Sequence, residues 1–468
     1  MESTSAANPT VLPASRDRRP WLILGSFIVG TLVALVWLIA FHDDPPPDDA
    51  HLMPQRSERG GNTNPLAVYC ITMERSGIVR DFYQLSNEAR TGEPAAMEEA
   101  RTFLLAHQAE LAAFQALMAT DASTWQWPDL ATPSRHQAAV VDRYSLYGVV
   151  SILTLQAHNA AQHGDMKEGL ALAERLVRFS QCLHHAEGNL QELAFAALVR
   201  AMAEEQALMI LSHGEATPEM IRTCLQNRLD QPEPDARHLH LAMKAEYAEV
   251  KQALSTITKK DIAESMGFPK KARSVLPYFY KPNRTLALEA RLTTARMEAA
   301  SQGWRTLHLV EQAHARSLEP HLNVRITPGT FLNPNFAGMH LLAVGQAERP
   351  ISLAGTDTLT IYAMYPQQVI ITLALRLHEL EKGTLPARLE ELVPAYLPAV
   401  PMDAYSGKPM RWDAARKIIY SVGPDLKDDG GDIHPDMRLR AGSKDPGIDY
   451  AWSKLPAASG ATGKTATP

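Results

Sequence analysis

The sequence predicts a mainly α-helical protein with an N-terminal transmembrane helix, an extracytoplasmic antiparallel helical bundle or short helical solenoid, and a small C-terminal α+β module with a β-hairpin. Three observations predict this fold: an uncharged apolar run near the N-terminus, helical periodicity through the middle, and two short β-type runs near the C-terminus. The predicted boundaries are a cytoplasmic tail at 1–20, a transmembrane helix at 21–41, a linker at 42–65, a helical domain at 66–350, the α+β module at 361–453 and a disordered tail at 454–468.

The apolar run WLILGSFIVGTLVALVWLIAF extends from Trp21 to Phe41 without a charge. A helix of this length can cross a hydrocarbon core of roughly 30 Å. Arginines precede the run and aspartates follow it, and the position of the arginines alone predicts a single-pass anchor with its N-terminus in the cytoplasm. A cleaved signal peptide is the alternative, but it requires a shorter apolar region and a small-residue cleavage site. We therefore expect an uncleaved anchor and an extracytoplasmic body.

The composition excludes some classes of function. The chain is 45% hydrophobic and 21% charged, with a formal net charge of −6. No basic patch of the kind that binds nucleic acid is evident, so we expect no nucleic-acid partner. The three cysteines, Cys70, Cys182 and Cys224, are too few for a disulfide-based scaffold and are expected to be small buried apolar residues.

Between Pro65 and about residue 320 the pattern is helical. One apolar stripe extends from Met97 to Met118. Asp165 precedes another helix as a predicted cap, and Pro218 occupies the first position of a third. Further helices are expected at about 190–211 and 284–315, whereas 43–65 is rich in Pro, Asp and Gly and predicts a linker that holds the body away from the membrane.

The pattern changes after Pro366. A helix is expected to end at Gly383, and the segments PMDAYSGKPMRW and ARKIIYSVG predict two short strands with a turn at 413–416. The stretch YSVGPDLKDDGGDI follows, with four aspartates in eight residues.

These segments resemble the C-terminal half of type II secretion major pseudopilins over about residues 366–453. The motif residues are Pro401, Asp403, Tyr405, Gly407 and Pro409, followed by Tyr420, Ser421, Gly423 and Asp425. The whole chain also resembles uncharacterised membrane-anchored bacterial proteins with a helical middle. Three departures matter: no prepilin-peptidase site lies near Trp21, a long helical region separates the apolar run from the strands where a pseudopilin has none, and Ala404 replaces a proline common in the motif.

The resemblance implies a calcium loop and a place in the bacterial inner membrane, near secretion or pilus-like machinery. By position, Asp425 and Asp432 would supply carboxylates, while Val422 and His434 mark the backbone carbonyls. Calcium takes six to eight oxygens and accepts irregular loops. The stretch is not an EF-hand, because the third position lacks an acid or amide. The alternative is a solvated loop whose aspartates cap turns.

No catalytic motif is evident. Neither G-x-S-x-G nor H-E-x-x-H occurs. Glu311 and His314 have the spacing of a di-iron ligand pair, but no second such motif accompanies them, so a surface ion pair is expected. Cys182 lies close to His184 and His185, and His238 and His240 form another pair, yet neither spacing assembles a helix-borne catalytic dyad.

We therefore expect a non-catalytic, membrane-anchored envelope protein that acts as a scaffold or interaction module, with a structural Ca²⁺ site and a protein partner in the envelope. The alternative is an envelope enzyme whose site is assembled from scattered residues of the helical domain. A cleft with convergent titratable groups would favour the enzyme.

Overall fold

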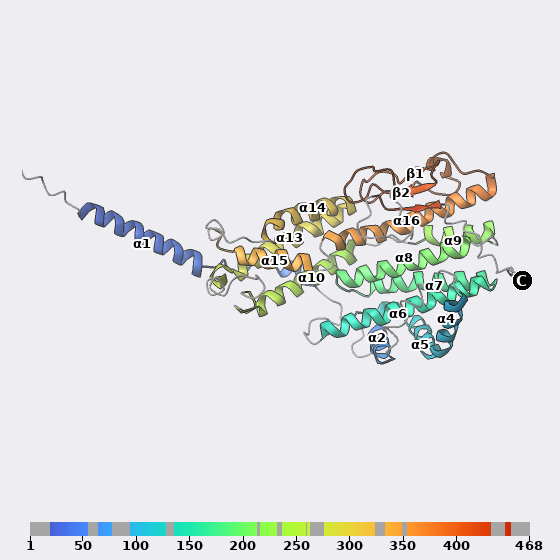
Figure 1. The fold of residues 1–468 in the computed structure, drawn as a ribbon, viewed down its shortest axis with the longest axis horizontal. Helices are drawn as coiled ribbons and strands as arrows, with labels where there is room; N and C mark the ends of the chain where they lie inside the picture. The colour runs from blue at the N-terminus through green and yellow to red at the C-terminus, as the bar shows by residue number, and fades with distance from the viewer. Residues whose placement is uncertain are drawn as a thin grey trace, which may run out of the picture.

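The computed structural model describes residues 19–54, 64–76, 94–127, 135–212, 216–231, 236–258, 260–262, 276–322, 333–348, 353–431 and 445–450. The chain forms an elongated body with one helix, α1 (Arg19–Phe41), projecting from an end (Figure 1). The prediction of a mainly helical chain with a small antiparallel β element is confirmed.

The centre of the body is a group of helices that lie side by side along its length (Figure 1). These are α6 (Arg135–Gln162), α7 (Met166–His185), α8 (Leu190–Ser212), α9 (Pro218–Leu229) and α16 (Leu353–Lys382). Helix α7 packs on α6 and α8, and α16 packs on α8 and α9. The connections from α6 to α7 and from α7 to α8 are short, as antiparallel neighbours require.

Two predicted helix starts are confirmed in atomic detail. The Asp165 side chain accepts a hydrogen bond from the backbone N–H of Glu168 at 3.0 Å. The Thr217 hydroxyl accepts one from the N–H of Met220 at 3.3 Å, with Pro218 at the first position of α9. Each cap satisfies a backbone donor that the helix itself leaves unpaired.

A second group of helices lies at the end of the body from which α1 projects (Figure 1). It comprises α10 (Ala236–Thr256), α13 (Pro282–Gln302), α14 (Trp304–Leu318) and α15 (Phe336–Glu348). The prediction of one helix at 284–315 is wrong, because Gly303 adopts a positive φ of 110° and separates α13 from α14. The predicted stripe at 97–118 is likewise divided at His107 into α4 (Pro94–Ala106) and α5 (Gln108–Met118).

Smaller elements complete the described part of the chain. Three helices pack beside α6: α2 (Pro65–Ser76), α4 (Pro94–Ala106) and α5 (Gln108–Met118). The short 3-10 turns are η1 (Ala50–Leu52), η3 (Ala122–Thr124), η4 (Leu276–Phe279), η5 (Glu319–His321) and η7 (Leu389–Leu392).

Residues 42–54, here called the N-terminal strap, bind to the body. The Asp43 carboxylate accepts hydrogen bonds from the N–H groups of Asn283 and Arg284 at the start of α13. The guanidinium of Arg284 donates to both oxygens of Asp44, each at 2.9 Å. The prediction of a linker that holds the body away is therefore corrected over these residues, because their carboxylates cap a helix and pair with its side chains.

The strap is also anchored by a buried acid and a buried leucine. Asp49 accepts hydrogen bonds from the Tyr247 hydroxyl and the Lys251 ammonium, both at 2.6 Å. Leu52 is fully buried against Tyr247 and Ala290. Burial opposes ionisation of Asp49, but the bonds from Lys251 and Tyr247 outweigh it and lower the pKa of this carboxyl.

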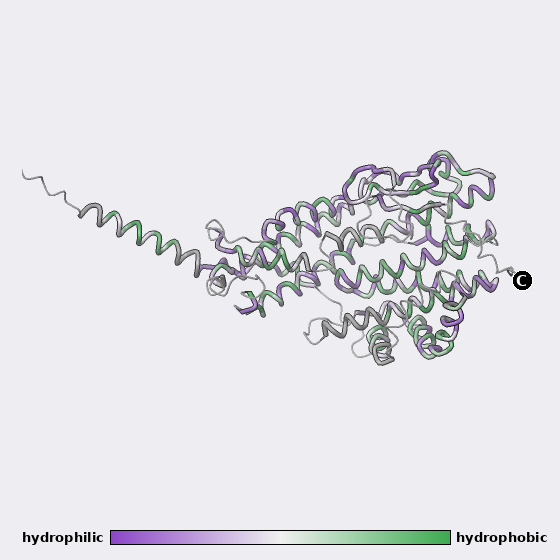
Figure 2. Tube along the Cα trace, in the orientation of Figure 1, coloured by the Kyte–Doolittle hydropathy of each residue, from purple (hydrophilic) through white to green (hydrophobic). Residues whose placement is uncertain are grey.

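Helix α1 extends away from the body, and hydrophobic residues follow one another along it (Figure 2). The side chains described on this helix, at positions 24–35, are all exposed. Within the described part of the chain, no helix combines the length and the apolar character that a membrane crossing needs.

A three-stranded antiparallel sheet lies against α16. Its strands are β1 (Arg411–Asp413), β2 (Ile418–Tyr420) and β3 (Gly447–Asp449), in the order β1-β2-β3. Trp412 pairs with Ile419, which in turn pairs with Ile448. The first two strands and their turn confirm the sequence prediction, whereas β3 was not predicted.

The central helices and the sheet share one hydrophobic core. Its buried residues include Leu176 of α7, Val199 of α8, Leu373 of α16 and Ile419 of β2. The sheet is also tied to α16 by polar contacts. The Gln368 amide donates to the carbonyl of Pro446, and the Tyr450 hydroxyl donates to Glu379.

Each helix group encloses a buried arginine. Arg228 of α9 donates to Glu204 of α8 at 2.7 Å and to Glu174 of α7 at 2.5 Å. Arg296 of α13 donates to Glu246 of α10 at 2.9 Å and to Glu311 of α14 at 2.5 Å. Each guanidinium therefore connects three helices, and the carboxylates raise its pKa, although burial alone would lower it.

Replacing Arg228 by Met should destabilise the body strongly, because Glu204 is fully buried and loses one of its two cationic partners. Breaking a buried ion pair by removing one member costs about 3–5 kcal/mol of unfolding free energy. Urea unfolding of the full-length chain in detergent, followed by circular dichroism, measures the change.

Arg222→Met on the same helix is the matched control, because Arg222 pairs with Glu381 at an exposed position. Exposed pairs contribute at most about 1 kcal/mol. Equal losses in the two variants would show that burial of the Arg228 network does not stabilise the bundle.

Candidate functional site

The buried carboxylate of Asp403 connects the two motifs that the sequence singled out. It accepts a hydrogen bond from the Ser406 hydroxyl at 2.6 Å and from the N–H of Tyr405 at 3.1 Å. From the second motif it accepts the Ser421 hydroxyl at 2.5 Å and the N–H of Val422 at 3.4 Å. The first motif therefore supplies the acceptor that fixes the start of the acidic loop.

The acidic loop, residues 421–431, turns sharply at its ends. Gly423 and Gly431 have φ angles of 64° and 80°, which glycine adopts without strain. Within the loop, Asp425 accepts the N–H of Lys427 at 3.0 Å, and Asp428 accepts the N–H of Gly430 at 3.2 Å. These bonds hold the backbone in turns and use one oxygen of each of the two carboxylates.

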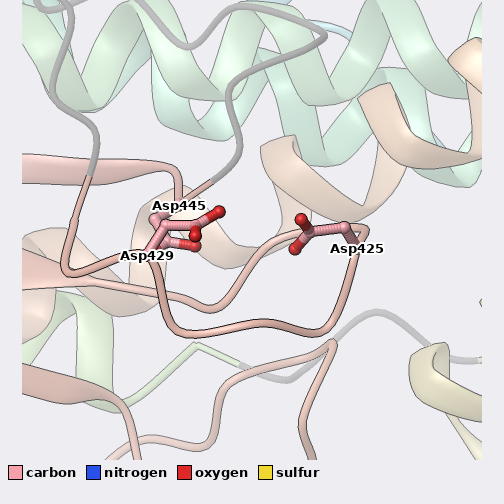
Figure 3. A group of neighbouring side chains, drawn as sticks. All are labelled: Asp425, Asp429 and Asp445. Carbon is pink, nitrogen blue, oxygen red and sulfur yellow. The ribbon is translucent and has the colours of Figure 1, made fainter.

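Asp445, which precedes β3, brings a buried carboxylate to the loop. It is 0% exposed, and its Oδ2 accepts the N–H of Gly431 at 3.0 Å. Its Oδ1 has no hydrogen-bond partner within the described residues. Oxygens of Asp425, Asp429 and Asp445 lie within 4.8 Å of one another, and the three side chains converge from two segments (Figure 3).

Negative charge is concentrated at this triad, whereas Asp428 is neutralised elsewhere. Arg411 donates to Asp428 at 2.9 Å, and the Tyr420 hydroxyl donates to it as well. Burial raises the pKa of the Asp445 carboxyl, and the carboxylates of Asp429 and Asp428 raise it further. Ionised Asp445 is therefore destabilising unless a cation compensates it.

The predicted ligand set is only partly brought together. Asp425 contributes to the triad. Val422 is buried against Met364 and Tyr405, with its N–H bonded to Asp403. Asp432 and His434 lie outside the described residues.

The predicted ligand set did not include Asp429 or Asp445. Asp445 lies 14 residues after Gly431, the last residue of the loop, and reaches it because β3 pairs with β2. The signal that could have found it is the segment KDPGID, in which an acid immediately precedes a short β-type run.

The acidic loop is also fastened to the helical body. The carbonyl of Pro424 accepts hydrogen bonds from His308 Nε2 at 2.7 Å and from the Gln312 amide at 3.0 Å. Both side chains belong to α14, and the ring of His308 packs edge-on against Tyr405 at 5.0 Å between centroids. The acidic loop is therefore in direct contact with α14 of the second helix group.

The pair Glu311 and His314 is not on the surface, so the predicted surface ion pair is wrong. Both side chains are buried, and Glu311 is bonded to Arg296. Burial and the nearby Arg296 lower the pKa of His314 to about 4. A guanidinium thus occupies the space between carboxylates that a metal would need, and this pair serves to pack helices together.

Replacing Asp403 by Ala should destabilise the chain by about 3 kcal/mol, because it leaves several buried donors unpaired. Asp403→Asn retains one acceptor oxygen and should lose less. Urea unfolding free energies of the full-length chain test this order.

Asp413→Ala provides the comparison, since Asp413 also accepts two backbone N–H groups but at a partly exposed turn. Its loss should stay near 1 kcal/mol. If the Asp403 variants lost no more unfolding free energy than Asp413→Ala, the proposal that the Asp403 carboxylate holds the two motifs together would be contradicted.

Comparisons with known proteins do not add to this geometry. No family model matches the sequence, and neither the curated proteins nor the solved structures contain a match to it. The pseudopilin resemblance therefore remains a prediction based on the motif residues.

Proposed function

We propose that this chain is a non-catalytic, membrane-anchored envelope protein in which a bound Ca²⁺ ion stabilises the acidic loop and fixes the C-terminal module on the helical body. The observation that carries the proposal is Asp445, a fully buried residue with one carboxylate oxygen that has no partner among the described residues, in a triad whose ligand oxygens lie within 4.8 Å of one another. A cation provides the compensation that no described protein group supplies to that oxygen.

The chemistry of the triad favours calcium. Carboxylate oxygens are hard donors, and Ca²⁺ accepts several of them at 2.3–2.6 Å in irregular geometry. Two oxygens bound to one such ion can be at most about 5 Å apart, a limit that the three aspartates meet. Asp425 and Asp429 are exposed, so the remaining coordination positions can be filled by water.

The role of the ion follows from the neighbours of the loop. Pro424 is held by α14, and Asp445 leads into β3, which pairs with β2. An ion bound to Asp425, Asp429 and Asp445 would connect these segments and stabilise the contact between the sheet and the helices. We assign it a structural role.

The proposed membrane anchor rests on the sequence of residues 19–41 and not on the structure. The uncharged run from Trp21 to Phe41 follows three arginines. The strap then joins α1 to the body, so the body would stand directly at the membrane surface. An interaction with secretion or pilus-like machinery is supported by the motif resemblance alone.

Calcium should raise the thermal stability of the full-length chain in detergent, and Asp445→Asn should abolish the rise. A site filled to one hundred times its Kd adds about 2.7 kcal/mol. In EGTA the order of the two unfolding temperatures should reverse. The raised pKa of Asp445 means that its ionised form destabilises the fold at pH values above the ordinary titration range of an aspartate. Asp445→Asn should therefore unfold at the same temperature as the unmodified chain or at a higher one.

Asp428→Asn is the matched control within the loop, because Arg411 already neutralises Asp428. It should keep the calcium response, whereas Asp425→Asn should weaken it. A calcium-dependent rise that persists in Asp445→Asn would assign the ion to another site, and no rise in the unmodified chain would refute the calcium site.

The anchor has its own test. The full-length chain expressed in bacteria should sediment with membranes and resist extraction by alkaline carbonate, while a chain that starts at His42 should be recovered in the soluble fraction. Full-length chain in the carbonate extract would contradict the anchor without affecting the calcium proposal.

A further inference from the structure

Three histidines meet where α7 ends and α10 begins, on residues that the proposed function does not use. The rings of His184 and His185, in the last turn of α7, both contact the ring of His238, in the first turn of α10. The ring centroids lie 5.0 Å and 4.7 Å from that of His238. Consecutive histidines on one helix converge here because the third ring comes from a different helix.

Two of the rings present nitrogen atoms at a spacing that suits one metal ion. His185 Nδ1 and His238 Nε2 are 3.1 Å apart. Two nitrogens bound at 2.0–2.1 Å to a tetrahedral ion are about 3.3 Å apart. The same spacing allows a hydrogen bond between the two rings, which holds their nitrogens at this distance when no ion is bound. His185 is exposed and gives an ion access from solvent.

His184 packs beside this pair and is not one of its ligands. Its Nε2 is buried and makes no hydrogen bond within the described residues. The nitrogens of His184 are too far from the first pair to share an ion with it, because the aspartates are the only described group of three or more such side chains whose ligand atoms lie within 4.8 Å of one another.

The end of α7 also favours a bound cation. Its last carbonyls give the helix end a partial negative charge beside His184 and His185.

We propose that His185 and His238 form a binding site for a divalent transition-metal ion of the Zn²⁺, Ni²⁺ and Cu²⁺ class, which links the end of α7 to the start of α10. Imidazole donors select this class, whereas Ca²⁺ and Mg²⁺ prefer oxygen. Two protein ligands leave the remaining coordination positions for water on the side of the exposed His185. The site shares no residue with the aspartate triad, so each can fail without the other.

The test is Zn²⁺ binding to the full-length chain, purified in detergent without a polyhistidine tag and stripped with EDTA. Isothermal titration should give one saturable site that is independent of the calcium triad. Its Kd should rise about tenfold or more in His185→Ala and in His238→Ala. Because His185 is exposed, its variant is expected to fold, which circular dichroism verifies.

Two control variants separate this site from other Zn²⁺ binding. His163→Ala removes an exposed histidine elsewhere and should leave the Kd unchanged, as should Asp445→Asn, which disables the acidic loop. Titration with Co²⁺ should produce visible d–d absorption that both cluster variants weaken. Absence of saturable Zn²⁺ binding, or a Kd that neither cluster variant changes, would overturn the proposal.

Discussion

The burial of α16 on nearly all sides is the constraint on which the rest of the body depends. From Val369 to Leu377 almost every residue is buried, so this helix has no face that could be left to solvent. One side packs on α8 and α9, and another supports β2 and β3. The small sheet can exist because α16 covers it, since three strands of three residues bury too little surface to be stable alone.

Polar contacts then fix positions that apolar packing leaves free. Arg228 and Arg296 each sit between helices whose hydrophobic faces would tolerate small sliding movements, and their carboxylate partners select one arrangement. Asp403 does the same between two turns of the C-terminal module. These groups contribute specificity of packing as well as stability, because a shifted neighbour would leave a buried charge unpaired.

Local chemistry explains which features were predictable from the sequence. Asp165 and Thr217 cap helices by accepting hydrogen bonds from residues three positions later, and the hairpin of β1 and β2 closes through a short turn. All the residues that determine these features therefore lie within a few positions of one another in the sequence. Gly303 was a weaker signal, because a glycine within a periodic segment is often tolerated in a helix.

The features that sequence reasoning missed depend on distant partners. Asp445 reaches the acidic loop through strand pairing, and the composition of 42–54, typical of a linker, conceals carboxylates whose partners lie some 200 residues later. Likewise, the proximity of His238 to the end of α7 follows from the packing of α10 on α8. No local pattern encodes such contacts, and they account for most of both candidate sites.

The N-terminal strap also determines how far the protein can reach. A flexible linker over 42–65 would let the body explore a volume with a root-mean-square extension of about 25–30 Å. With Asp43 and Asp44 clamped to α13, the body has almost no such freedom relative to the end of α1. In the proposed membrane-anchored arrangement, the body would lie at a fixed height and orientation above the membrane. Two such bodies anchored side by side would then meet at a high effective concentration without any tether between them.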